Sequence, residues 1–126
     1  MTEAPATHNQ PATPDPAPNV PEGFFPRNMG EGFMGVVGPL YTRRTEAGLQ
    51  LGFRVEQRHT NPMQICHGGM MATFCDMLCP LTAHRTSKEV GMRFLPTISL
   101  QVDYLGPAPL GASVQGEAQV LKVTRS

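Results

Sequence analysis

The sequence predicts an α+β domain in which an antiparallel sheet wraps around one long helix. Two segments with strand-like alternation come first, an apolar segment of helical length follows, and two more alternating segments come after it. A sheet packed on a single helix accommodates this order. At 126 residues, without an apparent internal repeat, the chain forms one domain at most.

The N-terminal part of the chain differs from the rest in composition. Residues 1–22 are rich in Pro, Ala and Thr and have no apolar periodicity, so we expect a disordered or extended tail. The predicted domain therefore covers residues 23–126. Its first stretch, residues 23–38, combines glycines with large apolar residues. It is either a short helix or loop that covers a pocket, or a simple hydrophobic lead-in.

Residues 36–44 and 49–58 are predicted to be two strands joined by a turn at residues 45–48. In the second strand every other side chain is apolar, which predicts one buried and one polar face. The alternating apolar positions are Leu49, Leu51, Phe53 and Val55.

Residues 68–83 are predicted to form a largely buried helix that begins at Gly68-Gly69. The glycines allow a tight turn and close approach of another molecule. The first turn of a helix has unpaired N–H groups and partial positive charge, which suits an anion or a carbonyl oxygen that becomes anionic. Asp76 is the one charge in this segment, and burying it would be costly unless it is used or paired. Pro80 is predicted to kink the helix.

Eight residues separate Gly68 from Asp76, about 12 Å along a helix. They therefore cannot act on the same substrate atom within one chain. Antiparallel helices across a two-fold axis would bring the Asp of one subunit to the Gly of the other. If both residues act in one reaction, the active unit is a dimer.

Two further strands are predicted after the helix. Residues 98–104 alternate through Ile98, Leu100, Val102 and Tyr104, a turn follows at residues 107–111, and residues 114–123 alternate again.

The spacing of Asn61, His67, Gly68, Gly69 and Asp76 resembles that of the hotdog-fold acyl-CoA thioesterases of the phenylacetate-pathway type. The resemblance extends roughly from Gly32 to the C-terminus and includes residues 97–108, which look like the central strand of that family. It implies a hotdog fold that lacks its last strands, because relatives continue for about two more strands.

The resemblance also implies a role for each matching residue. The Gly68 N–H would polarise the thioester carbonyl, and Asp76 would activate water or attack directly. Asn61 would hold the loop or the water, His67 would orient the loop and touch the acyl end, and Thr97 would help to hold the water. The implied function is hydrolysis of acyl-CoA to a free acid and CoA without a cofactor. The implied assembly is a homodimer or a dimer of dimers with the site at the dimer interface.

Several alternatives remain open at this point. A non-catalytic acyl-CoA-binding hotdog protein would retain the same motifs, and Pro80 and the early end of the chain favour it slightly. A truncated, inactive product is a third possibility. Cys66, His67, Cys75 and Cys79 suggest a metal site, but zinc needs a fuller set of well-placed ligands, so we expect no metal. Cys66 and His67 are adjacent, and a Cys–His catalytic pair is normally spatial rather than sequential.

Composition narrows the classes of partner. Ten basic and ten acidic residues give no net charge, so the chain lacks the electrostatic signature of binding to nucleic acid or to an anionic membrane. A run of about 18 apolar residues and a signal-peptide layout are both missing, so no membrane span or secretion is expected. We interpret the three cysteines as reduced thiols of a cytoplasmic protein.

Overall fold

The computed structural model of the protein describes residues 20–124, so most of the predicted tail lies outside the described residues. Within these residues, three helical segments and four strands follow one another. In order they are β1 (Phe25–Arg27), α2 (Phe33–Val37), β2 (Leu40–Thr45), β3 (Gly48–Arg54), the 3-10 helix η1 (Gln57–His59), α3 (Gly68–Thr86) and β4 (Ser113–Glu117).

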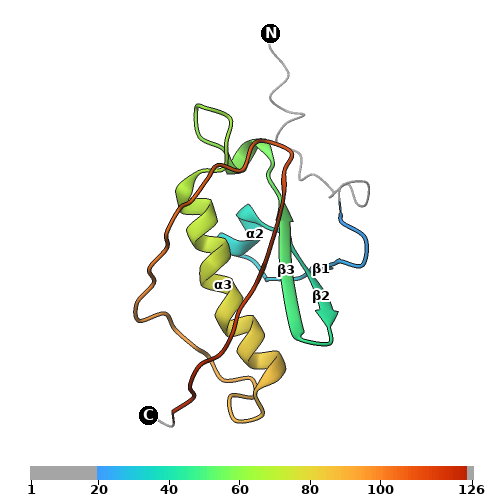
Figure 1. Ribbon diagram of the computed structural model, residues 1–126, viewed down its shortest axis with the longest axis vertical. Helices are drawn as coiled ribbons and strands as arrows, with labels where there is room; N and C mark the ends of the chain where they lie inside the picture. Colours follow the sequence, from blue (N-terminus) through green and yellow to red (C-terminus); the bar gives the residue numbers. More distant parts are fainter. Residues whose placement is uncertain (1–19, 125–126) are drawn as a thin grey trace.

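The strands form one antiparallel sheet in the order β1-β2-β3-β4. The long helix α3 packs along this sheet, mainly against β3 and β4 (Figure 1). The predicted α+β hotdog arrangement of an antiparallel sheet and one long helix is confirmed. Within residues 20–124, none of the helices combines the length and apolar character that a membrane crossing requires.

The hairpin β2–β3 supplies half of the core cluster of the described residues, namely Leu40, Leu49, Leu51 and Phe53. The pair next to its turn is Thr45 opposite Gly48, so the turn lies where the sequence predicts it. The predicted alternation is confirmed, because four side chains of the second strand and its extension are at most 4% exposed: Leu49, Leu51, Phe53 and Val55. The predicted bounds were too wide. Residues 36 and 37 belong to α2, and the chain leaves β3 after Arg54 and forms η1.

Helix α3 confirms the predicted helix and extends it by one turn, to Thr86. Met70, Phe74 and Leu81 are buried, and the Phe74 ring lies 5.1 Å from the ring of Phe53 on β3. The helix continues for six residues beyond Pro80, so this proline does not end it.

The predicted strand at residues 98–104, which the resemblance extends to residues 97–108, is wrong. Residues 95–105, which we call the strap, run back along α3 on the side away from β3 (Figure 1), and their backbone makes no hydrogen bond to the backbone of another described residue. Thr97 and Tyr104 both bond to α3, although they are seven residues apart. A regular strand would direct them to opposite faces, so the strap cannot keep strand geometry and make both contacts.

Strand β4 is shorter than predicted, because only residues 113–117 pair with β3. Gly116 explains the close packing of this strand against α3, since a Cβ at this position would lie 3.1 Å from the Phe74 ring. Residues 118–123 lie outside the strand, although alternate side chains as far as Val120 remain half-buried.

Candidate functional site

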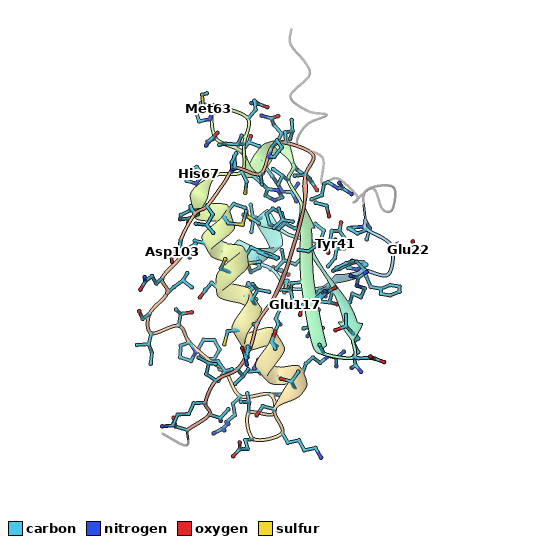
Figure 2. The ribbon with its side chains drawn as sticks, in the orientation of Figure 1. Glu22, Tyr41, Met63, His67, Asp103 and Glu117 are labelled. Carbon is cyan, nitrogen blue, oxygen red and sulfur yellow. The ribbon has the colours of Figure 1, made fainter. Side chains whose placement is uncertain are left out.

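The loop before α3 is held by its own first residue. Asn61 Oδ1 accepts the N–H groups of Met63, at 2.9 Å, and of Ile65, at 3.4 Å. The Asn61 N–H donates to the Ile65 carbonyl at 2.9 Å. This arrangement is an Asx turn, in which a side-chain amide replaces a backbone acceptor. Among the described residues, the Asn61 side chain bonds only within this loop, whose tip carries Met63 (Figure 2).

His67 caps the first turn of α3 (Figure 2). Its Nδ1 accepts the Gly69 N–H at 2.8 Å, and its carbonyl accepts the N–H groups of Met70 and Met71 at 2.9 and 3.1 Å. Helices begin with four N–H groups that have no partner within the helix. In α3, the Gly68 N–H is the one of these four that has no acceptor among the described residues. The turn thus leaves free the donor that the sequence assigns to an oxyanion.

A buried histidine that the sequence does not single out supports this loop. His59 is 2% exposed, and its Nδ1 accepts the Glu56 N–H at 3.0 Å. The proton is therefore on Nε2, which donates to the Val37 carbonyl at 2.7 Å. Burial lowers the pKa of His59, because desolvation penalises the charged imidazole more than the hydrogen bond to the Val37 carbonyl favours it. The His59 carbonyl accepts the His67 N–H at 2.8 Å, which fixes the position of the residue that caps α3.

Asp76 and Thr97 form a second cluster in the middle of α3. The Thr97 hydroxyl donates to Asp76 Oδ1 at 2.5 Å, and the aspartate is half-buried. Hydrogen bonds to an ionised acceptor are short and strong, so this contact fixes one carboxylate oxygen. The second oxygen, Oδ2, has no partner among the described residues. The arrangement suits a carboxylate that accepts a proton from a bound molecule.

The structure brings some of the predicted residues together and leaves others apart. His67 meets Gly68 and Gly69, and Asp76 meets Thr97. Gly68 and Asp76 are eight positions apart on one continuous helix, about 12 Å along its axis. The predicted residues of one chain therefore lie in two separate clusters, which we call the half-sites.

Tyr104 contacts the half-site at Gly68, although the sequence does not indicate this contact. Its hydroxyl donates to the Gly68 carbonyl at 2.7 Å, across 36 positions of sequence. No local pattern signals a contact of that range. The strap therefore contacts both half-sites, with Thr97 at one and Tyr104 at the other.

Two of the three cysteines have the properties of packing residues, whereas Cys79 is exposed. Cys66 and Cys75 are half-buried, and desolvation by burial raises the pKa of both thiols. A raised pKa disfavours the thiolate, which is the form that attacks carbonyls and binds metals. Between residues 20 and 124, no three His, Cys, Asp or Glu side chains gather closely enough to hold a metal ion.

Comparison with known families is decisive for the class of protein. The model of the thioesterase superfamily matches residues 63–126, which is half of the chain. The chain belongs to the thioesterase superfamily. The match begins in the Asn61 loop and covers α3, the strap and β4.

Three relatives agree with this membership of the thioesterase superfamily. A Pseudomonas aeruginosa protein that is provisionally named an esterase is 28% identical over 106 residues, which are 83% of this chain and 78% of that protein. A Caenorhabditis elegans protein with the same provisional name is 33% identical over 82 residues, 65% of this chain and 47% of that protein. Mouse acyl-coenzyme A thioesterase 13 is 29% identical over 70 residues, 55% of this chain and 47% of that enzyme. The chain thus spans about half the length of the latter two proteins. Superfamily membership and these names support a hydrolase activity on thioesters.

Proposed function

We propose that the protein hydrolyses acyl-CoA thioesters to a free acid and CoA, with the Gly68 N–H as the oxyanion donor and Asp76 as the general base or nucleophile. The observation that carries the proposal is the state of the first turn of α3. Three of its four N–H groups are bonded to His67, and the Gly68 N–H, at the positive end of a 19-residue helix, has no acceptor among the described residues. One donor at that end can bind the oxygen of a thioester carbonyl.

The reaction requires charge to develop on that oxygen. Asp76 accepts a proton from water, the water oxygen forms a bond to the thioester carbon, and the carbonyl electrons move onto the oxygen held by Gly68. A donor aimed at the developing charge stabilises the transition state more than the ground state. The intermediate then reforms its carbonyl and the C–S bond breaks. CoA leaves as a thiolate and takes up the proton, and the acid is released.

The alternative route uses Asp76 as a nucleophile. Its carboxylate attacks the thioester carbon, CoA thiolate leaves, and the resulting anhydride is hydrolysed by water. Thr97 serves either route, because its bond to Asp76 Oδ1 leaves the other carboxylate oxygen to face the substrate or the water. In this proposal Asn61 keeps the loop in shape, and His67 contacts the acyl group beside Gly68.

The proposed site is completed by a second copy of the chain. Because one helix separates Gly68 from Asp76 by about 12 Å, both can reach one thioester only if two antiparallel α3 helices face each other. Each subunit then contributes Gly68 to one site and Asp76 to the other. A homodimer, alone or paired into a dimer of dimers, is the active unit of this proposal.

The first test is release of thiol from a panel of short, long and aromatic acyl-CoAs. Asp76→Asn removes the charge but keeps the shape, and we expect it to lower kcat roughly 10²- to 10⁴-fold. Asp103→Asn is the matched control, since Asp103 lies on the strap, points away from α3 and has no partner among the described residues (Figure 2). Full turnover by Asp76→Asn would refute the proposal. A folded protein that binds acyl-CoA without hydrolysing it would instead be a binding protein.

A second test isolates the oxyanion donor. Proline is favoured at the first position of a helix, and His67 has φ −62° and ψ 138°, which the residue before a proline adopts readily. Gly68→Pro therefore removes the N–H with little cost to the helix, and we expect kcat to fall roughly 10²- to 10³-fold. Gly68→Ala retains the N–H and adds a Cβ at ordinary contact distance, 3.6 Å, from the Tyr104 ring. Equal losses in the two variants would contradict the assignment of the N–H.

A further inference from the structure

Tyr104 lies directly on the first turn of α3. Its hydroxyl donates to the Gly68 carbonyl at 2.7 Å, and its ring atoms lie 3.6 Å from the place that a Cβ on Gly68 would occupy. The ring is thus in van der Waals range of the residue whose N–H is free. Tyr104 is 56% exposed, so part of its ring remains accessible to a bound molecule.

The hydrogen bond from Tyr104 continues beyond Gly68. The carbonyl that accepts it and the Gly69 N–H belong to the same peptide group, and this N–H donates to His67 Nδ1 at 2.8 Å. Hydrogen bonds in such a chain polarise one another, so a donor at the carbonyl strengthens the donor at the other end of the peptide. The order is Tyr104 hydroxyl, Gly68–Gly69 peptide and His67 imidazole.

The chain of hydrogen bonds determines where His67 carries its proton. A neutral imidazole has one donor and one acceptor nitrogen, and Nδ1 is occupied as the acceptor. The proton is therefore on Nε2, which has no partner among the described residues. His67 is exposed, so this N–H can donate to a molecule bound at the helix end.

We propose that Tyr104 is a positioning residue of the thioesterase site, which fixes the Gly68–Gly69 peptide and keeps the His67 proton on Nε2. The substrate packs against the exposed part of its ring, next to the thioester carbonyl. The positioning of the peptide and the packing of the substrate both depend on the Tyr104 side chain, which lies on the strap. The inference rests on the function proposed above, in which Gly68 and His67 contact the substrate.

Two substitutions separate the hydroxyl from the ring. Tyr104→Phe keeps the ring and removes the donor, and a neutral hydrogen bond of this kind corresponds to roughly a 3- to 10-fold loss in kcat with little change in KM. Tyr104→Leu also removes the aromatic ring, so KM for acyl-CoA should rise roughly 3- to 10-fold in addition. Leu105→Ala is the control. Leu105 is the next residue on the strap and is 96% exposed, so its truncation removes little packing. A merely structural tyrosine would lower the unfolding temperature in both variants without this division between kcat and KM.

A measurement without turnover completes the test. Nitrogen-15 NMR of the imidazoles in mildly alkaline solution reports which ring nitrogen carries the proton. We expect His67 to have the proton on Nε2 in the parent protein and to become a mixture of tautomers in Tyr104→Phe. His59 should keep its proton on Nε2 in both, since its partners are Glu56 and Val37. An unchanged His67 tautomer in Tyr104→Phe overturns the inference. A parent protein that hydrolyses no thioester refutes the proposed function instead, and the NMR result still decides the role of Tyr104.

Discussion

The hairpin β2–β3 and the strap use similar sequence patterns for opposite purposes. Both alternate apolar with polar side chains, yet Leu51 and Phe53 of the hairpin are at most 1% exposed, whereas Ile98 of the strap is 97% exposed. The hairpin is connected to its neighbours by backbone ladders, and the strap is connected to α3 by two side-chain hydroxyls. Under the proposed function, the difference means that stability and chemistry depend on separate parts of this chain. Changes in the hairpin should cost stability, and changes in the strap should cost activity.

Phe53→Ala should have the largest effect on folding. The ring is buried between Phe74, at 5.1 Å, and His59, at 5.2 Å, so truncation opens a cavity in the core. We expect the free energy of unfolding in urea to fall by about 3–5 kcal/mol. Ile98→Ala on the strap is the matched change and should stay within about 0.5 kcal/mol. A loss of about 2 kcal/mol or more at Ile98 would show that another surface covers the strap and would end the contrast.

Thr97→Val should lower activity rather than stability. Valine preserves the shape of the side chain but cannot donate to Asp76, and hydrogen bonds to charged groups contribute about 1.5–3 kcal/mol. If the full value is expressed in the transition state, kcat for acyl-CoA falls roughly 10- to 100-fold. Ser99→Ala is the control, since Ser99 lies two residues away on the strap with no hydroxyl partner among the described residues. Equal activity in the two variants would separate Thr97 from the reaction.

The pH dependence of stability should show a smaller effect from His59, which lies on η1 and packs against Phe53 of the hairpin. The folded-state pKa of His59 is lowered by burial, so below the ordinary histidine pKa of about 6.5 the unfolded chain binds a proton more readily than the folded one. The contribution of His59 to stability is complete above that pH and is lost as the pH falls through the folded-state pKa. Urea titrations at a series of pH values should show this loss. His59→Gln should be less stable overall but flatter over the same interval, and an unchanged slope would point to another titrating group.

The sequence was a good guide wherever the relevant contact is local. Leu49 to Val55 alternate because both partners of β3 hold its backbone straight, and α3 forms where Gly68 begins a long apolar segment. His67 and Gly68 are neighbours in the chain, so their meeting at the start of α3 could be predicted from their order. The shared alternation at Ile98 and Leu100 was misleading, because a strand also needs a partner and two bonds to α3 bend the strap instead.

The long-range parts of the site could not be predicted from residue patterns. The resemblance assigned Thr97 a role in holding the water, but its contact with Asp76, 21 residues away in the sequence, was not predicted. Tyr104 was expected only as a strand residue, and its contact with Gly68 depends on the path of the strap. His59 gives no signal in the sequence either, because its burial depends on how η1 folds back against Val37 and Phe53. In each case the position depends on a tertiary contact and not on a local preference.

The central claim is that each active site combines Gly68 of one chain with Asp76 of another. It is tested most directly by coexpressing Gly68→Pro and Asp76→Asn chains and assaying thiol release from acyl-CoA. In a mixed dimer, one site receives both intact groups and the other receives neither, so random pairing should restore about one quarter of the parent activity. Each variant alone should remain near background. Activity of the mixture that does not exceed the average of the two separate variants would contradict the shared site.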